Sequence, residues 1–537
     1  MFPRIIFAFG ISAGCLLAGR ILMHYFQLES YQFPGYFRTV KRNLLKAVFP
    51  GICMSVLLIV SVILLNALFP APGFTVISAF AEAVIMAAGG VFIGYIFSEK
   101  KAKKPFVVTA RVKRLYGVSV IVISAILLIL QGAVRINPSH ARFAEAMILF
   151  FPALLPLTVA LCGLLAWPIE KGISEMYFRD AQRILRQRKD LIRIGITGSW
   201  GKTSVKFILG TILEEKYHTL VTPASYNTPM GVTKAIRTLL EPGHRIFIAE
   251  MGARHVGDIK EMCRLVHPQI GILTSVGPQH LDTFKTIDRI TSTKYELIEA
   301  LPQDGEAFFA DDEGICRKLY EKTTIRKHIT GSDSSKDEIW AENIQYTPEG
   351  STFVLCRNEE RTQCETQLLG RLNIMNILLC SSVGFSLGMT AEQIKRGIRK
   401  IEPVEHRLQL IRHPGGMSVI DDAFNSNIRG AKQAFEVLKQ FPSQRIVVTP
   451  GMVELGSEEY SMNRELGISM ADCCDIAILI GKKRSEAIAD GLRSQGYPEA
   501  RIKIVSSLDE ATGFLNETAH SGDTVLFEND LPDNYTE

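Results

Sequence analysis

The stretch DLIRIGITGSWGKTS, residues 190–204, decides the fold of the chain that follows it. It reads as an apolar strand, a glycine-containing turn and a helix that begins at Lys202. Gly198 and Gly201 let backbone N–H groups close on phosphate oxygens. Lys202 supplies a positive charge, and the Thr203 hydroxyl is placed to bind Mg²⁺. The stretch therefore predicts a nucleotide-binding loop in a parallel sheet.

Two later strands end in residues suited to metal binding. Arg245–Met251 is an apolar strand that delivers Glu250 near its end, and Gly271–Val276 is followed closely by His280. Ligands of open parallel sheets bind outside the carboxyl ends of the strands, so these side chains should converge on the nucleotide-binding loop. Glu250 and His280 are then candidate Mg²⁺ ligands.

Composition divides the chain into two parts. Of 537 residues, 47% are hydrophobic and 21% charged. Residues 1–190 hold 21 basic and 8 acidic residues, a net +13, whereas the remainder holds 39 and 47, a net −8. This excludes a disordered chain, and it argues against a nucleic-acid partner, because the soluble part lacks the basic surface of a nucleic-acid binder.

Four apolar stretches are each about 20 residues long, enough for a helix to cross a bilayer. They are Val48–Phe69, Phe74–Phe97, Leu115–Val134 and Met147–Pro168, and Ile5–Gly19 is a shorter fifth. Two connecting loops are basic, with five cations in Arg20–Lys46 and seven in Lys100–Arg114. The positive-inside rule favours five spans, and four would leave the C-terminal part on the same side. We predict a multi-pass protein of the cytoplasmic membrane with its catalytic domains in the cytoplasm.

Three features of this membrane part have two interpretations each. Gly10 and Gly14 form a G-x-x-x-G pair, which is typical of tight helix packing. Glu82 is the acidic residue within a clear span, and it indicates either a functional site or an interhelical hydrogen bond. Between Lys171 and Arg193, seven cations alternate with apolar residues. This pattern predicts a basic helix on anionic lipid, with a solvated linker helix as the alternative.

Several further stretches resemble the Mur ligases, which form amide bonds at the expense of ATP, and most closely the D-alanyl-D-alanine-adding subgroup. They are TPASYNTPMGV (222–232), EMGARHVGDI (250–259), TSVGPQHLDTF (274–284), LLGRLNIMN (368–376), EHRLQLI (405–411), VIDDAFNSN (419–427) and GMVELG (451–456). The shortened family loop G-x-x-G-K-T-[ST] matches Gly198–Ser204. It also explains why Ile196 stands where a longer phosphate-binding loop has glycine.

The resemblance implies a role for each matching residue. It implies that ATP binds through Gly198, Ser199, Gly201, Lys202, Thr203, Ser204, Asn376, Arg407 and Asp422. It implies two Mg²⁺ sites, one at Thr203 and Glu250 and one at His280. Lys294 falls where the family has a lysine that CO₂ often carbamylates, which would give a metal ligand. Lys202, His280, Lys294 and Arg407 are thus the implied catalytic set. Asp422 is implied to bind the ribose, and Asn425 and Asn427 lie near it in sequence. Glu454 either contacts the amine substrate or has a structural role.

These observations predict the domain organisation. An α-helical transmembrane domain occupies residues 1–170 and a basic juxtamembrane helix residues 171–190. A P-loop, parallel-sheet ATP-binding domain follows over 191–401, with a small antiparallel addition at 338–370. A Rossmann-like α/β domain of the Mur ligase type completes the chain over 402–537, and its last residues are expected to be acidic and exposed.

The predicted function is a membrane-anchored, ATP-dependent and ADP-forming ligase of a carboxylate and an amine, acting through an acyl phosphate in envelope or polymer synthesis. Membrane spans precede the nucleotide-binding loop where UDP-sugar ligases have a UDP-binding domain. We therefore expect a lipid-linked, polymeric or small acid, an amino acid or peptide as amine, membrane lipid, and envelope-synthesis proteins as partners. The alternatives are a P-loop ATPase coupled to transport and a scaffold with an inactive site.

Overall fold

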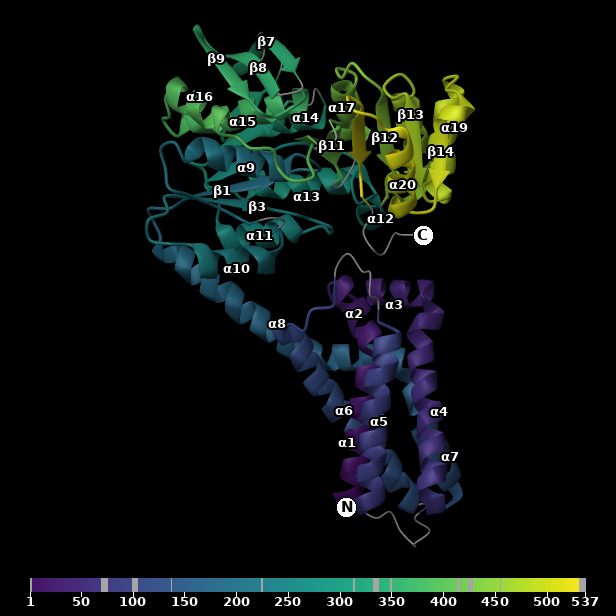
Figure 1. The fold of residues 1–537 in the computed structure, drawn as a ribbon. Helices are drawn as coiled ribbons and strands as arrows, with labels where there is room; N and C mark the ends of the chain where they lie inside the picture. Colours follow the sequence, from purple (N-terminus) through teal and green to yellow (C-terminus); the bar gives the residue numbers. More distant parts are fainter. Residues whose placement is uncertain are drawn as a thin grey trace. The chain divides into compact units, whose positions relative to one another are not determined.

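The computed structural model describes residues 2–68, 76–98, 105–136, 138–223, 226–311, 314–331, 338–347, 350–412, 416–423, 428–453 and 455–530. These residues form two compact units, the first ending at Glu175 and the second beginning at Met176. The boundary falls inside one long helix, α8 (Leu155–Gln187), which is continuous across it (Figure 1).

The first unit is helical. It contains α1 (Phe2–Ala18), α2 (Arg20–Leu28), α3 (Phe33–Arg42), α4 (Leu44–Leu68), α5 (Val76–Ile96), α6 (Ala110–Ile136), α7 (Pro138–Phe150), the short helix η1 (Phe151–Leu154) and the start of α8. Four segments are long and apolar enough to cross a membrane: Leu44–Leu68, Val76–Ile96, Ala110–Val134 and Ala141–Gln187. The pair α1 and α2, bent by 54°, would make a fifth if it counts as one span.

The basic segment 20–46, expected to be a connecting loop, instead forms α2 and α3. Its aromatic residues explain the difference. Tyr25, Phe26 and Tyr36 are buried, and the Tyr36 hydroxyl donates a hydrogen bond to the Pro156 carbonyl at 2.8 Å. Burial of these rings fixes the segment against its neighbours.

Gly10 and Gly14 do mark close helix packing. A Cβ at Gly10 would lie 2.3 Å from Ala83 Cα, and a Cβ at Gly14 would lie 2.3 Å from the Met86 carbonyl oxygen. Both neighbours belong to α5. The two helices therefore approach backbone to backbone, as the G-x-x-x-G pair predicts.

Glu82 is part of an interhelical hydrogen bond. The carboxylate is buried in α5, and the Ser61 hydroxyl of α4 donates to its Oε1 at 2.5 Å. A polar group in an apolar helix bundle is stabilised by such a partner. This contact supports the structural interpretation of Glu82.

The basic end of α8 packs on protein. Phe178, Ala181 and Leu185, three apolar residues among the cations, are buried in a core cluster of the second unit. Tyr177 lies under the Arg237 guanidinium, 4.3 Å from ring centroid to Cζ. The sequence interpretation, which assigned the apolar face of this helix to lipid, is therefore wrong for these residues.

The second unit begins with a six-stranded sheet in the order β2-β3-β1-β4-β5-β6, in which all pairs are parallel. Its strands are β1 (Ile192–Thr197), β2 (Thr219–Val221), β3 (Ile246–Glu250), β4 (Ile270–Leu273), β5 (Glu306–Ala310) and β6 (Arg326–Thr330). The connecting helices are α9 (Lys202–Leu213), α10 (Pro229–Leu239), α11 (Asp258–Val266), α12 (Leu281–Phe284), α13 (Ile287–Glu299) and α14 (Ile315–Lys322).

Alternate residues of these strands pack into two hydrophobic cores, one on each face of the sheet. Phe247 and Ala249 of β3 face the cluster that holds α10, α11, α13 and the end of α8. Ile246 and Ile248 face the cluster that holds α9, α15 (Arg371–Ser386) and α16 (Ala391–Arg399). Both faces are covered, which is why the strand reads as an unbroken apolar run.

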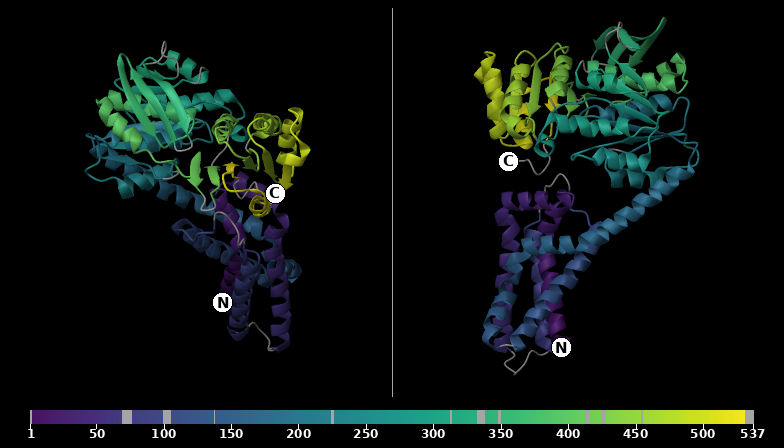
Figure 2. Two further views of the ribbon diagram at one scale, coloured as in Figure 1. Left: turned by 45° about the horizontal axis from the view of Figure 1, so that its top comes forward. Right: turned by 180° about the vertical axis from the view of Figure 1, so that it is seen from behind.

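Two further sheets complete the unit, one of three strands and one of six. The predicted antiparallel addition is confirmed as β7 (Ile339–Thr347), β8 (Gly350–Arg357) and β9 (Glu360–Thr366) (Figure 2). The C-terminal sheet has the order β10-β11-β15-β12-β13-β14. Its elements are β10 (Gln409–Arg412), β11 (Ser418–Asp422), α17 (Ile428–Leu438), β12 (Arg445–Thr449), η2 (Gly456–Glu458), α18 (Glu459–Met470), β13 (Ile476–Ile480), α19 (Lys483–Ser494), η3 (Glu499–Arg501), β14 (Ile502–Val505), α20 (Leu508–Thr518) and β15 (Thr524–Glu528). Strand β10 is antiparallel, and the others are parallel.

The close approach of α1 and α5 gives a testable prediction. Gly14→Leu inserts a side chain against the α5 backbone and should destabilise the first unit by about 1–3 kcal/mol. Gly117→Leu is the matched control, because a Cβ there would meet nothing within 4 Å. Thermal unfolding of the detergent-solubilised protein measures both. Equal melting temperatures for the two variants would contradict this packing.

Candidate nucleotide and ligation site

The candidate site lies where three parallel strands end. Ile196 of β1 pairs with Glu250 of β3, and Thr197 of β1 pairs with Leu273 of β4. The loops after β1 and β4 and the last residue of β3 therefore share one edge of the sheet. This is the edge at which open parallel sheets bind ligands.

The loop after β1 needs glycine at two positions. Gly201, the N-cap of α9, has φ +81°, which residues with a side chain rarely adopt. A Cβ at Gly198 would lie 2.1 Å from Thr274 Oγ1, so only glycine fits beside that hydroxyl. Together they allow the sharp turn from β1 into α9.

Side chains from the loop after β4 hold this turn in place. Thr274 Oγ1 and Ser275 Oγ donate to the Trp200 carbonyl at 2.6 and 2.9 Å. Ser199 Oγ donates to the Gly277 carbonyl at 2.9 Å and accepts from the Gly277 N–H at the same distance. A Cβ at Gly277 would lie 2.0 Å from the Trp200 ring, which therefore packs directly on that glycine.

Lys202 is folded back onto the turn. Its ammonium donates to the carbonyls of Gly198 and Ser199 at 2.8 and 3.1 Å. Burial lowers the pKa of Lys202 to about 8; Glu250 opposes this shift and the Arg407 charge adds to it. A phosphate anion at this point would favour the charged ammonium.

Glu250 is held by three side chains from two segments, α9 and the segment before α10. Its Oε1 accepts hydrogen bonds from the Thr203 hydroxyl and from Asn227 Nδ2, each at 3.1 Å. Its Oε2 lies 3.1 Å from Lys206 Nζ, and both side chains of this ion pair are buried. Burial acts to raise the pKa of Glu250, but Lys206 and Lys202 together hold it below its ordinary value. The carboxylate is therefore charged at neutral pH.

The donor atoms around Glu250 suit Mg²⁺, which prefers carboxylate and hydroxyl oxygens. Thr203 Oγ1 and Glu250 Oε1 already lie 3.1 Å apart, at the start of α9 and the end of β3. Ser204 follows in the first turn of α9. Thr203 and Glu250 are thus arranged so that one cation could replace the proton between them.

Two further sequence candidates lie on the segment after β4. His280 has φ +54° and is the N-cap of α12. Lys294 is in α13 and 2% exposed. Burial lowers the pKa of Lys294 well below its ordinary value, and Lys202 adds to this shift. Lys294 is therefore a buried amine whose surroundings favour its neutral form, and it lies close enough to Lys202 and Glu250 to respond to their charges.

The C-terminal sheet contributes to the same electrostatic environment. Arg407 lies just before β10, and its charge lowers the pKa of both Lys202 and Lys206 after the larger effect of burial. Asp422, the last residue of β11, accepts the Leu408 N–H at 3.0 Å. Burial raises the pKa of Asp422 to about 6, and Arg407 opposes the shift.

Asn376 also lies at the phosphate-binding turn. It belongs to α15, and a Cβ at Gly201 would come 3.5 Å from its Oδ1. The resemblance implies that Asn376 contacts ATP, and its side chain lies near the phosphate-binding turn.

Sequence reasoning missed four residues of this region. Lys206 and Asn227 hold Glu250, and the signal for Lys206 was a lone cation within the apolar face of α9. Glu528 and Asn529 follow from the end of β15; both are buried, and Asn529 Nδ2 donates to the Gly451 carbonyl at 2.6 Å. Glu528 ends the strand that the sequence predicts there, and Asn529, which follows that strand, is buried rather than exposed. Asn425, Asn427, Glu454 and residues 531–537 lie outside the described residues.

Comparison with known families agrees with this geometry. Residues 196–384 match the family model of the Mur ligase middle domain, and residues 406–528 match that of the Mur ligase glutamate ligase domain, together more than half of the chain. The chain belongs to the Mur ligase family. The resemblance read from the sequence is therefore confirmed, and so are the fold class and the enzyme class.

Individual relatives share part of the chain. A UDP-N-acetylmuramoyl-tripeptide–D-alanyl-D-alanine ligase of Escherichia coli is 28% identical over 318 residues, which cover 59% of this chain and 70% of the relative. The MurF structure from Acinetobacter baumannii has a TM-score of 0.61 at 23% identity and covers 67% of this chain and 78% of that one. MurF from Thermotoga maritima in complex with ADP has a TM-score of 0.60 at 23% identity and covers 66% and 80%. These structures share the fold.

The ion pair of Lys206 and Glu250 gives a prediction about stability. Lys206→Met leaves a buried carboxylate without its cation and should destabilise the second unit by about 3–5 kcal/mol. Lys206→Met combined with Glu250→Gln should recover most of that loss. Lys234→Met is the control, because Lys234 is exposed and donates only to the Tyr226 hydroxyl. Calorimetric melting distinguishes the variants, and equal melting of Lys206→Met and Lys234→Met would refute the role of the pair.

Proposed function

We propose that this protein is a membrane-anchored ligase that uses ATP to join a carboxylate to an amine and releases ADP and phosphate. The observation that carries the proposal is the cluster of charges at the strand ends. Lys202, Thr203 and Glu250 lie together. The charge of Arg407, which lies outside the parallel sheet, lowers the pKa of Lys202 and Lys206. Family membership supports this assignment.

The cations have a clear task in such a reaction. A carboxylate and the γ-phosphate of ATP are both anions, so their approach is opposed by charge repulsion. Lys202 would hold the phosphates in the turn, and Arg407 would add a second positive charge from the C-terminal sheet. Thr203 and Glu250 would hold Mg²⁺, which when bound neutralises phosphate charge. His280 is our candidate for a second such site.

The proposed reaction has two steps. An oxygen of the substrate carboxylate attacks the γ-phosphorus, the bond to the β-phosphate oxygen breaks, and ADP leaves. The amine nitrogen then attacks the carbonyl carbon of the acyl phosphate and loses a proton, and phosphate leaves with the former carboxylate oxygen. Because an acyl phosphate is hydrolysed by water, closure of Arg407 and Asp422 over the parallel sheet would protect it.

Lys294 is our candidate for carbamylation. A neutral amine attacks CO₂ and loses a proton, which turns a cationic side chain into an anionic oxygen donor. The burial and the lowered pKa of Lys294 favour the neutral amine that this reaction needs. The carbamate would lie near Lys202 and Glu250, where an additional oxygen ligand could serve a second Mg²⁺.

The helices of the first unit provide the basis for inferring where the protein is located and which acid it uses. Its apolar helices precede β1, and α8 continues from them into the second unit. We infer a cytoplasmic-membrane protein with its ligase unit in the cytoplasm and a lipid-linked carboxylate as acid substrate. Relatives named for the addition of D-alanyl-D-alanine make a dipeptide the first amine to test. Envelope synthesis is the corresponding process, and its membrane enzymes are candidate partners.

The test of this function is ADP release by the detergent-purified protein with ATP and Mg²⁺. Acids, including lipid-linked ones, are offered in pairs with amino acids and dipeptides. We expect turnover only with a matched pair, together with a new amide in the mass spectrum. Lys202→Ala should reduce turnover about a hundredfold or more, since it removes a charge that stabilises the transferred phosphoryl group. Turnover that ignores every pair but requires a reconstituted membrane would favour transport instead.

Carbamylation of Lys294 is tested separately. With ¹³C-bicarbonate, the wild-type protein should give a carbamate carbon signal that Lys294→Ala lacks. Lys294→Ala should lose about a hundredfold in turnover, and a short carboxylic acid should restore part of it, because it replaces the missing oxygen donor. Lys234→Ala, a change on the surface of α10, should behave as wild type. A signal unchanged in Lys294→Ala would rule out this lysine as the carbamylated group.

A further inference from the structure

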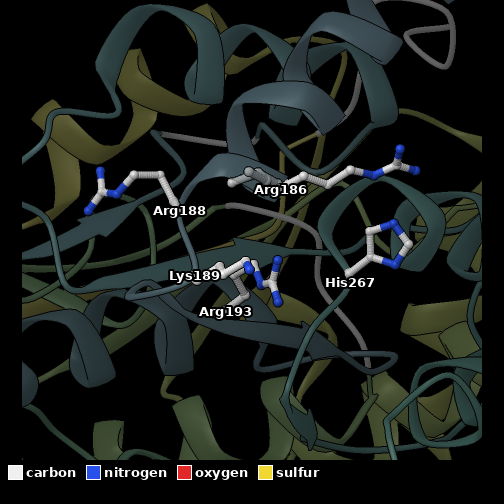
Figure 3. A pocket seen from close by; sticks show the side chains of 6 residues that line it. Arg186, Arg188, Lys189, Arg193 and His267 are labelled. Atoms are coloured by element: carbon white, nitrogen blue, oxygen red, sulfur yellow. The ribbon is translucent and has the colours of Figure 1, made fainter.

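A second charged region lies at the opposite edge of the parallel sheet. A pocket of about 330 Å³ there is lined by Leu185, Arg186, Arg188, Lys189, Arg193 and His267. Figure 3 shows its five basic side chains. Arg193 is the second residue of β1, and His267 is the C-cap of α11, three residues before β4 begins. The pocket is thus at the amino ends of β1 and β4, whereas the nucleotide-binding turn follows their carboxyl ends.

One of the five basic side chains has a structural role. Arg188 donates to both carboxylate oxygens of Asp190 and to the carbonyls of Glu241 and His244. Its guanidinium points away from the other side chains in Figure 3. Arg188 therefore fastens the end of α8 to the segment before β3.

The remaining cations, Arg186, Lys189 and Arg193, have no anionic partner among the residues that the structure describes. Arg193 Nε donates to a neutral acceptor, Gln269 Oε1, at 3.1 Å. Among the described residues, Arg186, Lys189 and Arg193 form no ion pair. Arg183 of α8, by contrast, is paired and lies 2.8 Å from Asp180. Three unpaired cations beside one pocket repel one another, and the sheet and α8 hold them there.

The neighbouring histidine responds to this positive charge. Burial lowers the pKa of His267, and the charges of Arg193 and Arg186 lower it further. Burial also lowers the pKa of Arg193. An anion in the pocket would relieve the repulsion that both groups experience.

We propose that this pocket is a second anion site, which binds a phosphate group that carries at least two negative charges or a diphosphate. Two arginines offer planar donor pairs that match phosphate oxygens, and Lys189 adds a point charge. The pocket is larger than a single phosphate needs, so the phosphate would carry a substituent or a second phosphate. This site is independent of the ligation reaction proposed above.

The phosphate has two possible sources, a soluble diphosphate or the headgroup of a membrane lipid. Arg186 lies on the helix that begins in the apolar first unit, 18 residues after Pro168. At 1.5 Å per residue this is about 27 Å along the helix axis. A lipid phosphate would therefore reach the pocket only if α8 lies along the membrane surface. A soluble diphosphate needs no such arrangement.

The experiment uses the full-length protein in detergent, saturated with ADP and Mg²⁺ so that the nucleotide site is occupied. Inorganic pyrophosphate is titrated by calorimetry, and the reactivity of Lys189 toward an amine-modifying reagent is followed by mass spectrometry. Arg186→Gln combined with Arg193→Gln should weaken pyrophosphate binding about tenfold or more and abolish protection of Lys189. The control Arg183→Gln should change binding by about twofold or less, because it removes an exposed, paired cation. Unchanged ADP affinity in each variant shows that the unit is folded.

The source is distinguished in nanodiscs, first without pyrophosphate and then with it. Without pyrophosphate, protection of Lys189 in discs with phosphatidic acid, whose phosphate monoester can carry two negative charges, but not in discs of phosphatidylcholine alone, lost in the double variant and kept in Arg183→Gln, assigns a lipid phosphate. Protection by pyrophosphate in both discs assigns a soluble ligand. If neither probe protects Lys189, or if the double variant and Arg183→Gln behave alike, the pocket is not an anion site. Ligase activity does not enter these readouts, so the proposed function is judged separately.

Discussion

The buried carboxylate of Glu250 is the point on which the candidate site depends. A charge at the end of β3, taken out of water, is tolerated only with partners, and the chain supplies Lys206, Thr203 and Asn227. Lys206 and Thr203 lie one turn apart on α9, so their contacts fix the start of that helix against β3. The position of the phosphate-binding turn is therefore set by the same carboxylate that would hold Mg²⁺. Structure and chemistry depend on one side chain.

The charges from the C-terminal sheet make the site sensitive to its ligand. Arg407 is positive, and its charge makes Lys202 and Lys206 harder to charge. A triphosphate between them would convert this repulsion into attraction and draw the two sheets together. Asp422 beside Arg407 limits the repulsion while no anion is bound. We propose that such a site would close when the phosphates arrive, which is when water has to be excluded.

Much of the fold was predictable because its signals are local. The turn at Gly198–Ser204 follows an apolar strand, and the alternating pattern at 338–370 does form an antiparallel sheet. Glu250 was identifiable because strand ends in parallel sheets converge. Lys206 was not identifiable, because a lysine on the apolar face of a helix has no evident role until its buried partner, Glu250, is known. Phe178 and Leu185 were misassigned to lipid because periodicity shows an apolar face without showing what covers it. The burial of Tyr25 and Tyr36 likewise depends on packing between segments distant in sequence.

The most direct test of the account follows the oxygen atoms of the released phosphate. The detergent-purified protein is given ATP, Mg²⁺ and an acid–amine pair in water enriched in ¹⁸O, and the phosphate is examined by mass spectrometry. If the carboxylate attacks the γ-phosphate, the fourth oxygen of the phosphate comes from the carboxylate, and the phosphate carries no ¹⁸O. Phosphate that carries one ¹⁸O atom per turnover would show that water is the attacking group. The protein would then be an ATP hydrolase, and the ligase account would be wrong.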